Sequence, residues 1–265
     1  KNFFVEGTYR YSYRKTDSDK ETYSRDAAGN YNILDERYTT NYDNTFVTQQ
    51  AELNFMKQEE KYNITIGASM QPSYTKSVGE GRDTSYTVTN FSPAARIDYR
   101  FSDDKFLRVR YRGRTSQPSI NQLMPVNDNS DPLKQTVGNP NLDPEFTHSL
   151  STEYRSNNRR NFSFFSASAD FSFTQNDIVA KKYYTEEGVQ ISTYENADKN
   201  VYSASGRIMV NTPIAKSNFS VNSFTMVRYN NSYSYVRDAG DWTENETSNL
   251  NISQMLRFTY RNDWA

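Results

Sequence analysis

The side chains that most often carry catalysis or metal binding are scarce in this sequence. It contains no cysteine and a single histidine, His148. The lack of cysteine excludes zinc-thiolate sites, iron–sulfur clusters, disulfides and a cysteine nucleophile. A Ser-His-Asp triad or a multi-histidine metal site would depend on His148 alone. We interpret His148 as an ordinary strand residue, and we expect no enzyme, no catalytic residue, no metal ligand and no cofactor.

Two oxygen-rich segments, 17–21 and 127–131, resemble calcium-binding loops in the alternation of their side chains. Both lack the glycine and the distal glutamate of an EF-hand loop. We interpret both segments as solvated loops. The sequence also shows no spacing of carboxylates that supports a carboxylate-pair mechanism.

One segment carries an arginine at every second position. The four residues are Arg108, Arg110, Arg112 and Arg114. They either line a lumen and attract anionic solutes, or form a solvated sheet face that pairs with carboxylates on neighbouring strands, which we favour. The candidate partners are Glu153, Asp98 and Asp170. In both cases the arginines are expected to face the lumen, because arginine near a bilayer midplane costs ~2–4 kcal/mol.

The same alternation of apolar and polar residues recurs along the chain and predicts the elements that hold these arginines. It appears near 5–14, 50–55, 62–71, 92–101, 107–114, 149–154, 165–173, 202–210, 219–227 and 250–260. A period of two is typical of a strand whose two faces meet different surroundings. We predict roughly ten strands of ~10–20 residues, longer than the usual ~5–6, with a bulge near 164–165.

The composition favours a β-barrel with a polar interior. The chain has 21 tyrosines and 16 phenylalanines, yet its mean hydropathy is -0.93. No apolar run approaches the ~20 residues of a membrane helix, whereas barrel strands need only alternate. A formal net charge of -1 gives no reason to expect a nucleic-acid partner.

The predicted connections alternate in length, as in bacterial outer-membrane barrels. Short turns are expected at 57–61, 102–104, 156–161 and 212–217, and long polar segments at 15–43, 76–83, 117–144 and 236–246, with a hairpin tip at 185–188.

Aromatic residues gather near the short turns: Phe55, Tyr62, Tyr99, Phe101, Phe106, Tyr154, Phe162 and Phe219. They predict an aromatic girdle at a membrane interface, although aromatics are also ordinary strand formers. The fold expected is all-β: an antiparallel up-and-down transmembrane β-barrel segment of about ten long strands, forming one domain over 1–265. An incomplete or partly closed barrel is the open alternative.

Two stretches resemble the barrel of TonB-dependent outer-membrane receptors of the Bacteroidetes type. Segment 90–102 leads into the arginine row and then into a loop motif made of Gly138, Asn139, Pro140, Leu142, Pro144 and Glu145. Segment 176–179, with Gly188 and 194–196, resembles the long hairpin that follows in the same barrels. The resemblance implies that the motif lies in an extracellular loop at the barrel mouth.

The resemblance also implies a function and a location. Such receptors lie in the bacterial outer membrane, contact its lipid, and take up scarce solutes such as metal chelates, glycans or peptides. The TonB system acts on them only through a plug domain, which this sequence does not show. The family barrel has about 22 strands, so we expect this chain to be part of a larger receptor. The alternative is a soluble or surface-exposed β-rich glycan-binding domain.

Overall fold

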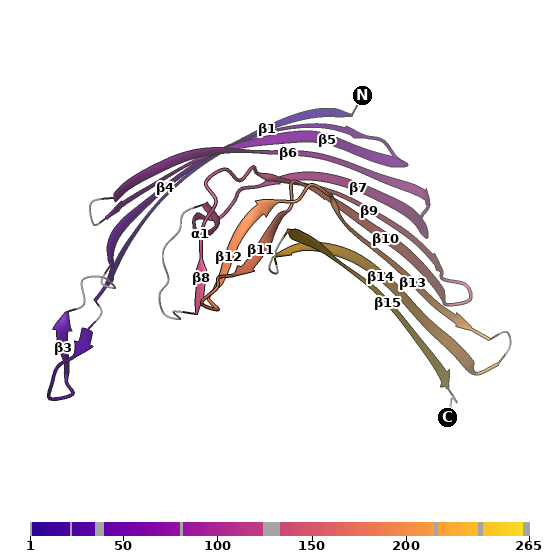
Figure 1. Cartoon of the computed structure of the whole chain (residues 1–265). Coiled ribbons are helices and arrows are strands. Elements are labelled where there is room, and N and C mark those ends of the chain that lie inside the picture. Colours follow the sequence, from indigo (N-terminus) through magenta and orange to yellow (C-terminus); the bar gives the residue numbers. More distant parts are fainter. Residues whose placement is uncertain are drawn as a thin grey trace. The chain divides into compact units, whose positions relative to one another are not determined.

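The computed structural model describes residues 2–21, 23–34, 40–79, 82–123, 133–214, 217–237 and 241–261. Strands dominate this part of the chain, and thirteen of them form one sheet (Figure 1). No helix among these residues is long and apolar enough to cross a membrane. The predicted all-β class is confirmed.

Ten long strands follow one another in the sheet in the order in which they occur in the chain. They are β1 (Phe3–Lys20), β4 (Thr40–Gln58), β5 (Tyr62–Gly79), β6 (Arg82–Ser102), β7 (Lys105–Ser116), β9 (Glu145–Asn158), β10 (Ser163–Gln175), β13 (Val201–Pro213), β14 (Phe219–Arg237) and β15 (Trp242–Tyr260). From β6 to β15 each consecutive pair is antiparallel. This is the up-and-down order that the alternation predicts, and β1 and β15 are its terminal strands.

The chain divides into two compact units. The first comprises residues 1–5, 54–67 and 92–265, and the second comprises 6–53 and 68–91. The second unit holds the remaining lengths of β1, β4, β5 and β6 and a small hairpin of β2 (Tyr23–Arg25) and β3 (Tyr31–Leu34). In the turn of that hairpin the Asp26 carboxylate accepts hydrogen bonds from the Ala28 and Asn30 amides and from the Asn32 side chain, and these bonds lower the pKa of Asp26.

Short elements fill two of the long connections. These are α1 (Ile120–Leu123), β8 (Lys134–Thr136), β11 (Ile178–Tyr184) and β12 (Gln190–Asn196). β11 and β12 form the predicted hairpin, and Gly188 at its tip has the positive φ of 81° that favours glycine. β11 pairs in parallel with β14 beyond the point where β13 begins, and β12 pairs in parallel with β8.

Some expected connections are wrong. Segments 76–83 and 236–246 are largely strand, because β5 continues to Gly79, β6 starts at Arg82 and β15 starts at Trp242. Segment 17–20 also lies in β1 and is not a loop, while segment 127–131 lies outside the described residues. The strands therefore extend well past their apolar alternation.

The bulge expected near 164–165 is also wrong. β10 pairs in unbroken register with β9 and β13 through Phe164 and Phe165. A register shift occurs instead in a different hairpin, between Arg100 and Ser102 next to the β6–β7 turn. Phe162, which precedes β10, has a φ of 54°, so the turn itself and not the strand absorbs the change of phase.

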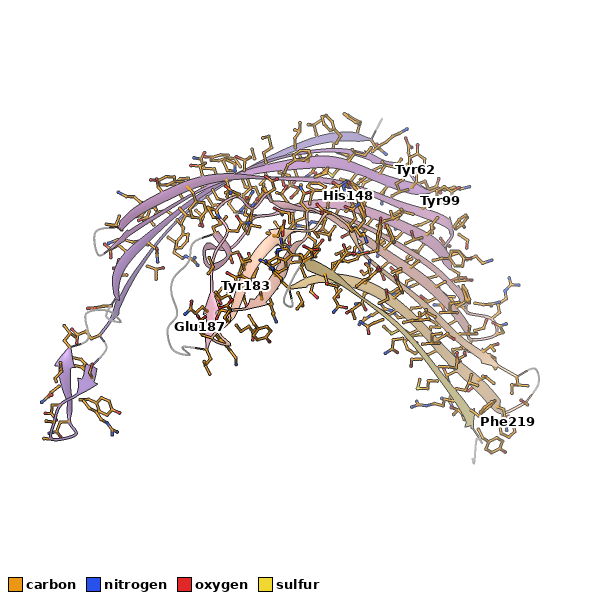
Figure 2. All side chains as sticks on the ribbon, in the orientation of Figure 1. Tyr62, Tyr99, His148, Tyr183, Glu187 and Phe219 are labelled. Atoms are coloured by element: carbon orange, nitrogen blue, oxygen red, sulfur yellow. The ribbon has the colours of Figure 1, made fainter. Side chains whose placement is uncertain are left out.

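The strands from β6 to β15 have two chemically different faces. The register places on one side, the apolar face, residues such as Ile97, Val109, Leu150, Ala169, Ile208, Val227, Ile252 and Phe258. The opposite side, the charged face, carries Arg96, Asp98, Arg100, Arg108, Arg110, Arg112, Arg114, Glu145, Glu153, Arg155, Asp170, Arg207, Arg228 and Arg257. Side chains stand on both sides of the strands (Figure 2).

The apolar face is exposed and does not form a core. Ile252 and Phe258 are 66% and 68% exposed. The buried apolar residues of the described chain are Leu142, Val179 and Ala197. A soluble protein does not leave so much contiguous apolar surface in water, so this face requires an apolar solvent.

Candidate solute-facing surface and loop clasp

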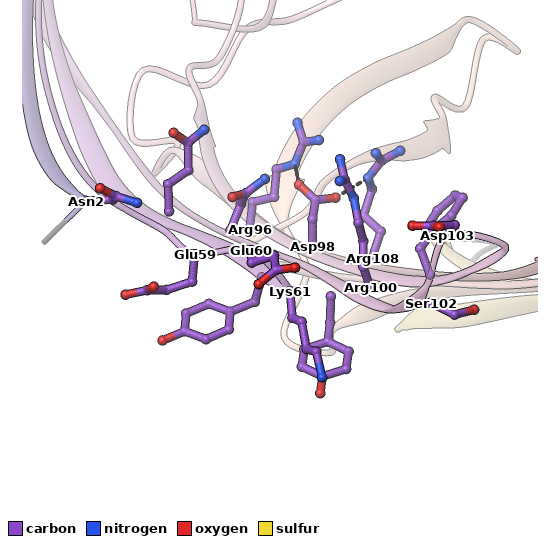
Figure 3. Close-up of a pocket in the computed structure, with 15 residues that line it drawn as sticks. Asn2, Glu59, Glu60, Lys61, Arg96, Asp98, Arg100, Ser102, Asp103 and Arg108 are labelled. Atoms are coloured by element: carbon purple, nitrogen blue, oxygen red, sulfur yellow. Dashed lines mark hydrogen bonds and ion pairs between the residues drawn. The ribbon is translucent and has the colours of Figure 1, made fainter.

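An ion-pair chain crosses three strands of the charged face. Asp98 of β6 lies opposite Arg108 of β7, which lies opposite Glu153 of β9. Asp98 binds Arg96 at 2.6 Å and Arg108 at 2.5 Å, as Figure 3 shows. Arg108 reaches Glu153 at 3.6 Å, and Glu153 binds Arg155 at 2.6 Å. Each carboxylate thus holds two guanidinium groups.

Phe106 belongs to this charged face and not to the aromatic girdle in which the sequence placed it. Its register partners are Arg100 and Arg155. The Arg108 and Arg155 guanidinium carbons lie 5.5 and 5.7 Å from the centre of its ring, within cation–π range. The girdle prediction for Phe106 is wrong because closeness to a turn does not decide which face a side chain takes.

A hollow of about 770 Å³ lies beside the ion-pair chain, at the short-turn end of β6. Arg96, Asp98 and Arg108 line it together with residues 58–63 of the β4–β5 turn (Figure 3). The Arg100 amide donates to the Lys61 carbonyl at 2.7 Å and joins the two segments. The lining combines these charged side chains with the rings of Tyr62, Tyr99 and Phe106.

The four arginines of β7 have two kinds of surroundings. Arg108 is half-buried in the ion-pair chain, as the interpretation of a paired sheet face expects. Arg110, Arg112 and Arg114 are exposed, and none makes an ion pair with a described residue. Asp170, a third expected partner, lies near Arg207 at 3.9 Å instead.

Aromatic rings line the apolar face near the short turns and form what we call the turn-side belt. The contacting pairs are Phe3–Phe55, Tyr99–Phe101, Phe101–Tyr154, Tyr154–Phe165 and Phe219–Tyr260, with ring centres 4.8–6.4 Å apart. Phe162 lies in the β9–β10 turn and is 83% exposed. Apart from Phe106, the predicted gathering of aromatics at these strand ends is present.

A second group of rings, the loop-side belt, lies at the other end of the same face. His148 contacts Phe146 and Phe173 with ring centres 4.7 and 5.6 Å apart, and its Nδ1 lies 2.9 Å from the Tyr111 hydroxyl. Phe173 continues to Tyr202 at 5.3 Å. His148 therefore packs as one ring among aromatics.

The spacing of the two belts is close to the height of the apolar band of a barrel. Phe146 and Tyr154 lie on the same side of β9, eight residues apart, which is about 26 Å along a strand. For a strand tilted by about 40° this is roughly 20 Å along the membrane normal, against an apolar band about 25 Å tall. Between the belts, the register places no charged residue on the apolar face of the described strands from β6 to β15.

The loop motif forms a clasp on the base of the β11–β12 hairpin. Asn139 donates from its side chain to the Tyr194 carbonyl at 2.9 Å, and its amide donates to the Gln122 carbonyl. Glu145 accepts the Ile178 amide at 2.8 Å. The motif therefore ties α1, β9, β11 and β12 together.

Asn196 is the centre of the clasp. Its side-chain oxygen accepts the Asp143 amide at 2.8 Å, and its side-chain nitrogen donates to the carbonyls of Asp143 and Asn176. Leu142 is buried, and Gly138, Pro140 and Pro144 complete the segment. The prolines have no N–H that would need a partner in so tight a connection.

A half-buried carboxylate, Asp177, lies beside the clasp. Burial, and secondly the neighbouring Glu145 carboxylate, raise the pKa of Asp177 above its ordinary value. Among the described residues no group of three or more His, Cys, Asp or Glu side chains is placed to hold a metal ion.

Comparison with known proteins decides the family. The chain matches the outer membrane protein β-barrel family over residues 1–265. The chain belongs to this family. The apolar face of this outer-membrane barrel protein therefore meets lipid, and the match favours the membrane interpretation over the alternative of a soluble glycan-binding domain.

One solved structure supports the barrel fold, and two others have lower TM-scores. A structure named copper transporter OprC shares 12% sequence identity with a TM-score of 0.60, over 87% of this chain and 39% of its own. The siderophore receptors PirA from Pseudomonas aeruginosa and from Acinetobacter baumannii share 16% and 11% identity, with TM-scores of 0.46 and 0.42, over 83% and 96% of this chain. The chain spans 39%, 51% and 54% of these three proteins. No curated protein sequence matches it.

Two features of this outer-membrane barrel protein were not predicted from the sequence. The loop-side belt was recognisable from Phe146, Phe171 and Phe173, which share one phase of the alternation with Leu150. The docking of the motif onto Asn196 has no local signal, because its partners lie 53 residues apart.

Proposed function

We propose that this chain forms part of the barrel wall of a TonB-dependent receptor that takes up a scarce solute across the outer membrane. The observation that supports this proposal is the difference between the two faces of the sheet. One face is an apolar band bounded by aromatic belts, and the opposite face is rich in arginine. A barrel wall with water inside and lipid outside requires that arrangement. The order of arginine strand, loop motif and hairpin is the order found in such receptors.

The proposal assigns a place to each candidate residue. The charged face, with Arg108, Arg110, Arg112 and Arg114, lines the lumen. The motif lies on the extracellular side, because outer-membrane barrels have short turns on the periplasmic side and long connections outside. Residues 1–265 form one barrel domain, since β1, β4, β5 and β6 each run through both compact units. A plug encoded elsewhere in the receptor would link the barrel to TonB.

A genetic experiment tests this function. A strain lacking the gene, a TonB-deficient strain and the double mutant are grown where one metal chelate, glycan or peptide limits growth. We expect the gene deletion to impair growth on one of these classes, and the double mutant to grow no worse than the TonB-deficient strain. Normal growth of the deletion strain on all three classes, or an additive defect in the double mutant, would contradict the proposal.

A further inference from the structure

We infer that the solute taken up is an anion, held by Arg110, Arg112 and Arg114 of β7, which make no ion pair with a described residue. This inference rests on the proposed function, because it names the chemical class that the same surface receives. The overall composition gives no hint of it, since the net charge of the chain is -1. The indication comes from the arginine row of β7 and from the way in which the fold distributes the charges around it.

The charged face carries a large excess of positive charge. Among the described residues of the seven long strands from β6 to β15, the register places ten arginines on this face but only four carboxylates, Asp98, Glu145, Glu153 and Asp170. Asp98 and Glu153 are already bound by arginines, and Glu145 accepts the Ile178 amide. Lipid behind the sheet provides a medium of low dielectric constant, which strengthens the field in front of it.

Within this face, Arg110, Arg112 and Arg114 form a ladder open to a ligand. They lie about 7 Å apart along one side of β7. Across β9 their register partners are Ser151, Ser149 and Thr147, none of which is charged. A guanidinium group binds carboxylate or phosphate with two parallel hydrogen bonds, and the neighbouring hydroxyls are further donors. The ladder therefore fits a small solute with two or more anionic groups.

A binding experiment on the full-length receptor, purified from outer membranes in detergent, tests this inference. The probe is a fluorescent pyrene trisulfonate, and the matched probe is the same ring with three uncharged sulfonamides. We expect the receptor to bind the trisulfonate and not the sulfonamide, and the affinity to fall with added salt. Combined Arg110→Gln, Arg112→Gln and Arg114→Gln changes are expected to weaken binding at least about tenfold, because charge-assisted hydrogen bonds are lost.

The control variant removes three charges elsewhere. Lys57→Gln, Arg159→Gln and Arg160→Gln alter the short-turn rim, where Arg159 is exposed, and should leave the affinity nearly unchanged. Equal losses in the two variants, or an unchanged affinity in the β7 variant, would overturn the inference. If the receptor binds the probe as expected but the deletion strain shows no TonB-dependent growth defect, only the proposed function is overturned.

Chemical labelling of the unaltered receptor gives an independent answer if the β7 variant does not assemble. Phenylglyoxal modification, read by mass spectrometry, should reach Arg110, Arg112 and Arg114 and should spare Arg108, which is bound by two carboxylates. The trisulfonate should protect the three reactive residues. If they are unreactive before any anion is added, an acidic protein segment covers them and the inference is wrong.

Discussion

Residues that share one strand face still differ in what they can do. Arg108 is held by Asp98 and Glu153, so its charge is neutralised and its side chain is fixed. Arg110 and Arg112, two and four residues further along β7, have uncharged partners on β9. The difference comes from the neighbouring strands and not from β7 itself, because only Arg108 lies level with carboxylates on both sides.

Gly113 interrupts the apolar side of the same strand for a steric reason. A Cβ atom at Gly113 would lie 2.7 Å from the Phe146 ring and 2.7 Å from the Pro93 ring. We expect Gly113→Ala to destabilise the barrel by about 1–3 kcal/mol through overpacking, measured as a lower urea midpoint of unfolding in lipid vesicles. Gly206→Ala is the control, because nothing lies within 4 Å of its Cβ position. Equal effects of the two substitutions would contradict this account of Gly113.

At the scale of elements, the clasp joins the loop motif to the β11–β12 hairpin, and its stability depends on the protonation of Asp177. The raised pKa of Asp177 means that the clasped state binds a proton there more tightly than the open state does. The clasp is therefore most stable when Asp177 is protonated, and it loses this stability as the pH rises through the raised pKa of that residue. Glu145, which accepts the Ile178 amide, is the neighbouring charge.

Asp177→Asn should remove this dependence on pH. We expect the hydrogen-exchange protection of the Ile178 amide to increase at neutral pH in this variant. In the unaltered protein, protection should increase as the pH falls from neutrality towards the ordinary aspartate range, about 4. Glu186→Gln, at the exposed hairpin tip, removes the same charge and should leave the protection at Ile178 unchanged. Unchanged protection in Asp177→Asn would show that the half-buried Asp177 carboxylate does not destabilise the clasp at neutral pH.

The elements themselves were largely predictable, and the site only in part. Alternation such as Leu107 to Arg114 marks each strand because lipid and water impose it residue by residue. It does not mark where a strand ends once both faces are in water, which is why β5 and β6 run past the expected loop. The alternation also puts Phe106 in the phase of Arg108, so its face was predictable. The clasp on Asn196 depends on distant segments, and no local pattern reports it.

At the scale of the whole molecule, the protein is organised by two solvents and not by a core. The few buried apolar residues of the described chain, Leu142, Val179 and Ala197, lie in the motif, in β11 and just after β12. The long strands are held instead by backbone ladders and by lipid against the apolar face. Stability should therefore depend on which face receives a substitution more than on how deeply the residue is buried.

Ala169 and Ser168 test that dependence on adjacent positions of β10. Ala169 lies on the apolar face midway between Phe165 and Phe173, which belong to the two belts, and it pairs with Thr152 and Gly206. Ala169→Arg should cost about 2–4 kcal/mol, the cost of arginine near the bilayer midplane, and should reduce the heat-modifiable, assembled form in outer membranes. Ser168→Arg places the same side chain on the charged face, between Glu153 and Arg207. Water solvates the added charge there, so the urea midpoint should fall much less than in Ala169→Arg. If the two variants lost stability equally, water would lie on both sides of the sheet. The apolar face would then not face lipid.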